Sequence, residues 1–206
     1  MQRSKSSRRW LDEHFNDIYV KKAQAEGYRS RAVYKLMEIA EKEQLFKPGM
    51  IVLDLGASPG GWSQYVAQQL KGKGRVIASD LLPMEPLVGV EVMLGDFTED
   101  LILQRLTESV APQGVDVLLS DMAPNMSGNA AIDIPRAMYL VELVLECAGA
   151  LLKPGGTLLT KIFHGAGFDE IVHITRQRFE RVVIRKPRAS RARSRETYLL
   201  AQRFRG

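Results

Sequence analysis

The sequence predicts an α/β fold in which a mostly parallel sheet carries helices on both faces. Short apolar runs alternate with stretches of helical apolar spacing along most of the chain, and this alternation is typical of parallel β–α–β units. The last apolar run is different, because a polar, basic loop with no helical spacing precedes it. A parallel return needs a long crossover, usually a helix. We therefore expect the last strand to run antiparallel to its neighbour.

The composition is that of one folded domain. The 206 residues are 45% hydrophobic and 26% charged, which are ordinary values for a globular protein, and the length suits one core. We place a basic N-terminal extension at residues 1–28 and a single domain at residues 29–206. The chain has no apolar run of membrane-spanning length, and its basic N-terminus lacks the apolar segment of a signal peptide.

The cysteine content bears on the compartment. Cys147 is the single cysteine, so an internal disulfide is excluded and a reducing compartment is favoured. We expect a cytoplasmic protein without membrane contact. We also expect a monomer, because no surplus apolar stripe stands out.

The two ends of the chain are strongly basic. Residues 1–35 carry nine Lys or Arg against four Asp or Glu, and residues 176–206 carry eleven against two. The part between them is acidic, although the whole chain has a net charge of +5. Basic ends favour a polyanionic partner such as RNA, since cations replace the counterions of the phosphates. Solubility is the plainer alternative. The candidate RNA contacts crowd eleven positions, at Arg185, Lys186, Arg188, Arg191, Arg193 and Arg195.

The expected elements follow one another with few gaps. Buried strands are predicted at residues 51–55, 76–79, 90–94, 115–119, 157–162 and 181–184, with a last strand at 197–202. Helices are predicted at residues 28–40, 62–70, 99–110, 135–152 and 168–179. Ser30 is the expected cap of the first helix, whose apolar stripe has Lys35 at its edge. Asp133 precedes the helix at 135–152, Pro135 suits its first turn, and the turn at 154–156 ends it.

A glycine-rich turn joins the first strand to the next helix. Asp54 lies at the end of the strand, and the turn at residues 56–61 holds three glycines. Glycines let a backbone turn sharply and approach a ligand closely. The spacing is not G-x-G-x-x-G, which argues against a dinucleotide, and a turn that only reverses the chain is the alternative. A strand, a glycine turn and a helix in this order favour a nucleotide-like ligand.

Acidic side chains follow several of the expected parallel strands. The carboxyl ends of such strands meet at one edge of the sheet, where ligands bind, and an antiparallel last strand starts at that edge. Asp80 has the spacing from Asp54 that suits a carboxylate binding ribose hydroxyls, and Asp96 follows the third strand, where such folds meet an adenine. Solvated loop carboxylates are the alternative for each residue alone. The residues expected at this edge are Asp54, Asp80, Asp96, Asp121, Lys161 and Glu196.

Lys161 lies inside an otherwise apolar run, which is an unusual place for a lysine. A buried ammonium group costs desolvation free energy unless it is paired, and a lysine whose head reaches solvent is the alternative. Acidic neighbours at the same edge favour a catalytic role. Residues 121–124, Asp-Met-Ala-Pro, are similar to the Asp-Pro-Pro-Tyr type of motif of base N-methyltransferases but lack its second proline and its aromatic residue. Without that ring to stack a flipped base, chemistry on a base is disfavoured.

Several long motifs together resemble one family, the FtsJ-type RNA ribose 2′-O-methyltransferases. The motifs are residues 27–36, 54–64, 120–128, 133–138 and 190–196, and the resemblance covers nearly the whole chain. It implies the Rossmann-like fold of S-adenosylmethionine (AdoMet) methyltransferases, with seven strands and an antiparallel last one. It implies a catalytic tetrad at Lys35, Asp121, Lys161 and Glu196, and AdoMet contacts at Gly60, Trp62, Asp80, Asp96 and Asp121. Ser58 departs from the alanine common in the family, which is a small change.

The resemblance also implies a reaction and a partner. The expected acceptor is the ribose 2′-hydroxyl of a uridine in large-subunit ribosomal RNA, within the assembled subunit, and no metal is expected. Neighbouring charges of both signs leave open whether Lys161 removes the proton of the hydroxyl or only orients it. One alternative is a methyltransferase for a small molecule, which leaves the basic ends unexplained. The other is a non-catalytic RNA-binding or ribosome-assembly protein, which has no use for Lys161.

Overall fold

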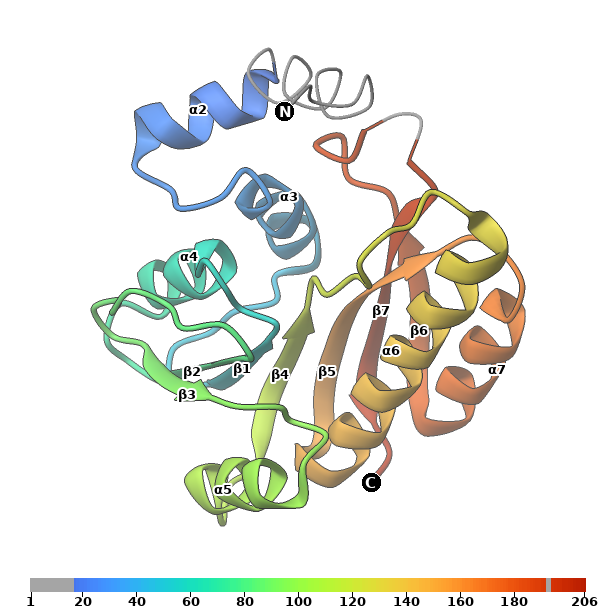
Figure 1. Cartoon of the computed structure of the whole chain (residues 1–206). Helices are drawn as coiled ribbons and strands as arrows, with labels where there is room; N and C mark the ends of the chain where they lie inside the picture. The colour runs from blue at the N-terminus through green and yellow to red at the C-terminus, as the bar shows by residue number, and fades with distance from the viewer. Residues whose placement is uncertain (1–16, 192–193) are drawn as a thin grey trace.

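The centre of the molecule is a seven-stranded sheet. The computed structural model describes residues 17–191 and 194–206, and its strand order is β3-β2-β1-β4-β5-β7-β6 (Figure 1). The strands are β1 (Ile51–Leu55), β2 (Arg75–Asp80), β3 (Glu91–Leu94), β4 (Val115–Ser120), β5 (Leu152–Phe163), β6 (Phe179–Arg185) and β7 (Glu196–Phe204). The first five pair in parallel, whereas β7 is antiparallel to both β5 and β6. The predicted antiparallel last strand is confirmed.

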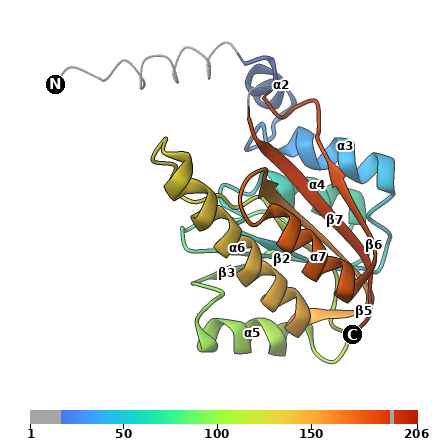
Figure 2. The same ribbon diagram turned by 90° about the vertical axis from the view of Figure 1, so that its right-hand side faces the viewer.

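Helices cover both faces of this sheet. They are α2 (Ile18–Glu26), α3 (Val33–Glu43), α4 (Gly61–Leu70), α5 (Asp100–Val110), α6 (Ala130–Leu151) and α7 (Phe168–Arg178). Side chains alternate along β1, so that Leu53 joins the core under α5, α6 and α7, and Val52 joins the core under α3 and α4. Figure 2 shows the sheet between α6 and α7 on one side and α3 and α4 on the other. Within residues 17–191 and 194–206, no helix is long and apolar enough to cross a membrane.

The first predicted helix starts later than expected. α3 begins at Val33 rather than at residue 28, and the residue before it, Ala32, makes no side-chain cap. Ser30 is not the cap, because its Oγ accepts the amide of Ala32 at 3.1 Å in a turn that precedes the helix. Residues 29–32 are therefore a separate stretch of chain that enters α3.

The start of α6 was also predicted wrongly. The helix begins at Ala130 and is capped by the side chain of Asn129, so Pro135 lies inside it rather than in its first turn. Asp133 cannot cap a helix here, because its carboxylate accepts the amides of Ser127 and Gly128 at 2.8 and 2.9 Å. This pairing closes the loop in front of α6.

Two strand predictions need correction as well. β3 was expected to be buried, but three of its four residues are exposed because it is an edge strand paired only with β2. Residues 154–156 were expected to form a turn after the long helix. They lie instead within β5, which begins at Leu152 directly after α6.

The described part of the predicted N-terminal extension packs on the core. The rings of Tyr19 and Tyr28 lie 5.5 and 6.2 Å from the ring of Tyr34 in α3, and two residues of α2 are buried. From residue 17 onward, the segment therefore docks through aromatic side chains. Residues 1–16 of the predicted extension lie outside the described residues.

Candidate active site

Four side chains from four different elements meet at the carboxyl edge of the sheet. Lys161 Nζ lies 2.8 Å from Asp121 Oδ1 and 3.9 Å from Glu196 Oε2. Lys35 Nζ lies 2.8 Å from Glu196 Oε1 and 3.9 Å from Asp121 Oδ2. Each lysine therefore faces both carboxylates, and the four charges balance. The sequence predicted these four residues, and the structure brings them together.

The register of the sheet explains how this cluster forms. Lys161 in β5 stands opposite Tyr198 in β7, and Glu196 precedes Tyr198 by two residues, so all three side chains project from the same face. Asp121 follows β4 directly, beside β5. Lys35 comes from α3 above them and lies 5.7 Å from the centre of the Tyr198 ring.

The ion pairs of this cluster are largely shielded from water. Lys161 is 8% exposed, so the lysine with its head in solvent is excluded, and its Nζ also donates to the backbone carbonyl of Asp121 at 2.6 Å. Burial raises the pKa of Asp121, but the charges of Lys161 and Lys35 outweigh it and leave that pKa below its usual value. Asp121 is thereby kept ionised as the partner of Lys161.

Tyr198 belongs to the site, although the sequence did not single it out. Its hydroxyl donates to Asp121 Oδ1 at 2.5 Å, and burial together with the charges of Asp121 and Glu196 raises its pKa well above the ordinary value. The hydroxyl stays protonated and can only donate to the carboxylate. Its position two residues after Glu196 on a strand was the signal that could have identified it.

A cavity of about 790 Å³ adjoins the cluster, and Asp80, Asp96 and Asp121 all line it. Asp80 accepts the amides of Ser58 and Leu82 at 2.8 and 2.7 Å, so it also fixes the glycine turn. Asp96 Oδ1 accepts from the amide and hydroxyl of Thr98 at 2.9 and 2.7 Å. The predicted carboxylates thus converge on one hollow.

The lining of this cavity fits a nucleoside-like ligand. Ser79 Oγ lies in the lining and is buried without a hydrogen-bond partner among the described residues. A buried hydroxyl of this kind is costly unless a bound molecule satisfies it. With the carboxylates of Asp80 and Asp96 beside it, the cavity suits a ligand that carries hydroxyl groups and an amine-bearing ring.

The glycine turn lies between this cavity and a smaller hollow of about 100 Å³ that Asp54, Trp62 and Asp121 line. Gly60 has a φ of +100°, a backbone conformation that side chains rarely adopt, and a Cβ there would push against Met84 Sδ at 2.6 Å. Trp62 is 4% exposed, and its indole N–H donates to the carbonyl of Ala32 at 2.8 Å. Its ring serves packing, which leaves the turn's backbone to meet a ligand.

Asp54 is the buried carboxylate under the turn. It is 1% exposed, and its Oδ2 accepts the hydroxyl of Ser63 at 2.6 Å. Burial raises its pKa to about 7, and the charges of Asp121 and Asp80 add to this rise, against the hydrogen bond from Ser63. The sequence placed Asp54 at this edge but gave no sign that its pKa is raised.

The six predicted RNA contacts divide into different groups. Arg185 Nη2 binds Glu43 Oε1 at 2.5 Å, and Lys186 Nζ donates to the carbonyls of Ser194 and Glu196 at 2.6 and 2.5 Å. Arg185 ties the end of β6 to the end of α3, and Lys186 holds the loop between β6 and β7. Their charges are thus already engaged by partners within the chain.

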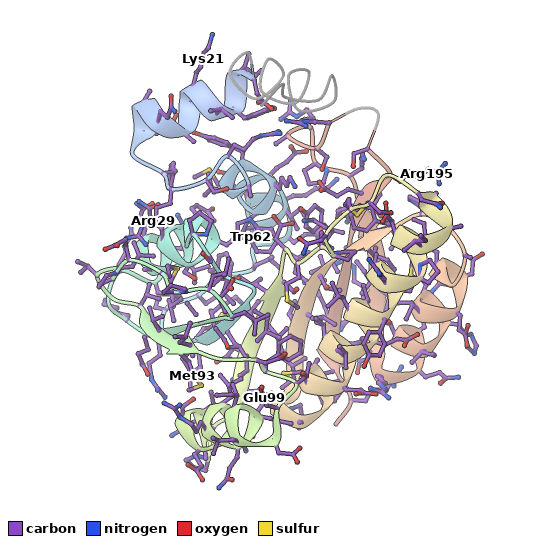
Figure 3. All side chains as sticks on the ribbon, in the orientation of Figure 1. Lys21, Arg29, Trp62, Met93, Glu99 and Arg195 are labelled. Atoms are coloured by element: carbon purple, nitrogen blue, oxygen red, sulfur yellow. The ribbon has the colours of Figure 1, made fainter. Side chains whose placement is uncertain are left out.

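Two of the remaining cations of that loop are exposed, and a third lies near a carboxylate. The side chain of Arg188 is 86% exposed, Arg195 is exposed, and Arg191 lies 3.9 Å from Asp17. Arg193 lies outside the described residues. Figure 3 shows Arg195 at the periphery, away from Trp62 in the interior, and Figure 1 shows the loop at the same edge of the sheet as α2 and α3.

Known proteins are similar to this chain in sequence and in fold. Ribosomal RNA large subunit methyltransferase E of Legionella pneumophila (strain Lens) is 66% identical over 204 residues, which cover 99% of each chain. The protein of that name from Pseudomonas fluorescens is 58% identical over 206 residues, covering 100% of this chain and 99% of its own. The crystal structure of a ribosomal RNA methyltransferase from Plasmodium falciparum superposes with a TM-score of 0.80 at 29% identity, covering 87% of this chain and 100% of that one.

More distant structures share the fold alone. Human methyltransferase-like protein 13, solved in complex with SAH, superposes with a TM-score of 0.60 at 16% identity, covering 82% of this chain and 81% of that one. This similarity identifies the sheet and its helices as the Rossmann-like fold of methyltransferases. A model of the FtsJ-like methyltransferases matches residues 28–204, and the chain belongs to that family.

Proposed function

We propose that this protein transfers a methyl group from AdoMet to the ribose 2′-hydroxyl of a uridine in large-subunit ribosomal RNA. The observation that carries the proposal is the contact of Lys161 with Asp121 at 2.8 Å, at the rim of the ligand cavity. The names of the bacterial relatives, which cover the whole chain, support the large-subunit ribosomal RNA as substrate. We further propose that the assembled large subunit is the natural substrate.

AdoMet would bind along the glycine turn and in the cavity. Trp62 lines the smaller hollow and Gly60 lies in the same turn, so we propose both for the sulfonium end. The carboxylate of Asp80 suits the ribose hydroxyls, and Asp96 suits the adenine amine. The bound cofactor supplies a methyl group already activated by its sulfonium, and we propose that no metal takes part. Asp121, which lines both hollows, lies between the cofactor and the acceptor.

The tetrad would act on the acceptor hydroxyl. A ribose hydroxyl is a weak nucleophile until its proton is withdrawn. Lys161 Nζ is the group placed to take that proton when it is neutral, or to orient the hydroxyl when it is an ammonium. Asp121 and the Tyr198 hydroxyl fix the position of Lys161. Glu196 and Lys35 form the opposite wall of the site and align the ribose. Much of the rate comes from holding the hydroxyl in line with the methyl group.

Four cations of the loop between β6 and β7 would hold the RNA backbone. Arg188, Arg191, Arg193 and Arg195 are proposed as phosphate contacts, because phosphate contacts position a nucleic acid without reading its sequence. Arg185 is engaged by Glu43 of α3, and Lys186 is engaged by backbone carbonyls of the loop. We propose that the enzyme acts as a cytoplasmic monomer, built as one domain at residues 29–206 with a basic extension at 1–28.

Transfer of a labelled methyl group tests the proposal. The protein is incubated with radiolabelled AdoMet and large ribosomal subunits that lack their methylations, and the labelled nucleotide is mapped after nuclease digestion. Label on the ribose of a single uridine is the expected result. Label on a base would contradict the assigned acceptor. AdoMet binding without any transfer would favour the assembly-factor alternative.

A further inference from the structure

The short segment Arg29–Arg31 touches the loops on both sides of the site. We propose that Arg29 and Arg31 are positioning residues: Arg29 holds the loop at residues 81–88 beside the cofactor cavity, and Arg31 holds the backbone at Ala189, next to the Ser190 that binds Glu196. The inference rests on the proposed function of the site. It assigns two arginines of a basic region to the assembly of the active site instead of to RNA phosphates.

Arg29 binds its loop through two backbone carbonyls and the glycine turn through a third. Its Nη1 donates to Glu85 at 2.6 Å and to Pro59 of the glycine turn at 3.2 Å, and its Nη2 donates to Pro86 at 2.8 Å. The backbone amide of Arg29 is itself fixed by Gln64 Oε1 of α4 at 3.1 Å. One guanidinium therefore ties the glycine turn to the loop that follows β2.

That loop forms part of the cofactor cavity. Leu81 and Leu82 at its start line the cavity, while Met84 and Leu87 lie so close to Gly60 that a Cβ at this glycine would come within 2.6 and 2.8 Å of them. A shift of the loop would open the cavity wall. Figure 3 shows Arg29 near the end of α4, at the connection between α2 and α3.

Arg31 makes a separate set of contacts and is mostly buried. Its side chain is 17% exposed, and its Nη1 lies 2.8 Å from Asp17 Oδ2 at the start of α2. Its Nη2 donates to the carbonyl of Ala189 at 2.5 Å, and its guanidinium lies 5.7 Å from the ring of Tyr19. The charge is paired and the donors point inward, which is unlike a phosphate contact.

The contact at Ala189 is linked to the tetrad through the neighbouring residue. The next residue, Ser190, donates its hydroxyl to Glu196 Oε1 at 2.8 Å, and the same oxygen pairs with Lys35 at 2.8 Å. Ser190 is 7% exposed, so this link is shielded from water. Arg31 thereby fixes the backbone from which Ser190 orients Glu196.

The residue between the two arginines packs against the glycine turn. A Cβ at Gly61 would lie 2.9 Å from Ser30 Cβ and 3.3 Å from the Ser30 amide nitrogen. The first turn of α4 therefore needs a glycine to admit the 29–31 segment. Both loops are held from a single anchor that cannot move without disturbing the turn.

Lysine substitutions distinguish positioning from phosphate binding. A lysine keeps the positive charge but cannot reproduce the fork of donors that reaches three carbonyls from Arg29, and a carbonyl and a carboxylate from Arg31. Arg29→Lys is expected to weaken AdoMet binding about tenfold by calorimetry, with the affinity for large subunits and its salt dependence unchanged. Arg31→Lys is expected to lower kcat about tenfold with AdoMet affinity retained.

Two further variants provide an independent test and a matched control. Ser190→Ala removes the link to Glu196 without touching Arg31, and it is expected to lower kcat several-fold while leaving both affinities unchanged. Arg105→Lys, at an exposed site on α5, is the matched control and is expected to behave as wild type. Thermal unfolding of each variant, followed without ligand, shows that it is folded.

The opposite pattern would overturn the inference. If the two lysine variants match wild type while Arg29→Ala and Arg31→Ala lose subunit affinity and each flatten its salt dependence by about one unit, the arginines are phosphate contacts. If Ser190→Ala leaves kcat unchanged, the route through Glu196 is wrong. Because AdoMet affinity is measured without transfer, the Arg29 result stands even if methyl mapping rejects the proposed acceptor.

Discussion

Lys161 and Tyr198 stand opposite each other on β5 and β7 and donate to the same oxygen, Asp121 Oδ1, at 2.8 and 2.5 Å. An ammonium and a phenol thus fix one carboxylate from one face of the sheet. A carboxylate with two donors on one oxygen is held in one orientation. The lysine that it pairs with is then fixed as well.

Removal of the Tyr198 hydroxyl is expected to slow transfer. Tyr198→Phe keeps the ring packed against Trp62, 5.8 Å away, but takes one donor from Asp121, and that hydrogen bond helps to lower the pKa of Asp121. We expect kcat to fall about tenfold with AdoMet affinity unchanged. Steady-state methylation and calorimetry measure both quantities, and an unchanged kcat would show that the hydroxyl is only structural.

Asp54 is expected to make stability depend on pH. Burial raises its pKa from 3.8 to about 7 in the folded protein. The contribution of Asp54 to the free energy of unfolding is therefore fully present below about pH 4. It is lost as the pH rises through about 7, because the folded state must then accept a buried charge. Asp54→Asn removes this loss.

Unfolding in denaturant at several pH values checks this expectation. From about pH 4 to pH 8, the free energy of unfolding of Asp54→Asn should rise relative to that of wild type by on the order of a few kcal/mol. Asp100→Asn, at an exposed position in the first turn of α5, is the control and should follow wild type. Parallel pH profiles for wild type and Asp54→Asn would contradict the raised pKa.

Arg185 is expected to matter for stability. It pairs with Glu43, whose side chain is 7% exposed, and burial of that carboxyl is outweighed by Arg185 and Arg181, which lower its pKa. Arg185→Ala leaves a shielded carboxylate short of a partner and should reduce the free energy of unfolding by about 2 kcal/mol. Denaturant unfolding measures the loss. Full stability with weaker subunit binding would instead restore Arg185 to the RNA contacts.

The exposed cations Arg188 and Arg195 are expected to contribute to RNA affinity. The double variant Arg188→Gln, Arg195→Gln removes two exposed charges from the loop between β6 and β7. Binding of large subunits should weaken, and the slope of log affinity against log salt should fall by about two. Arg105→Gln on α5 serves as the control for net charge. An unchanged slope for the double variant would remove this loop from the RNA-binding surface.

Much of the fold could be predicted because it depends on local pattern, whereas the tetrad as a set followed from the resemblance to the FtsJ-type family. Strand ends mark Asp121 and Lys161, and the antiparallel last strand follows from the missing crossover helix. Helix starts were less predictable, since Asp133 has the residue type of a cap but pairs instead with the loop before α6. Sequence pattern does not show which backbone amides the carboxylate of such a residue will bind.

The roles of the arginines could not be predicted, because their partners are distant in sequence. Arg185 meets Glu43 across 142 residues, and Arg31 meets Ala189 across 158. A basic run looks alike whether its charges face solvent or internal carbonyls. The structure therefore divides a region that the sequence treats as uniform.

Replacement of Lys161 tests the central claim most directly. In single-turnover methylation of unmethylated large subunits, Lys161→Ala should lose transfer by at least about a hundredfold, while its affinities for AdoMet and for the subunit stay at the wild-type values. That result would assign Lys161 to the acceptor hydroxyl. Transfer at the wild-type rate, or loss of AdoMet binding in the folded variant, would contradict the account.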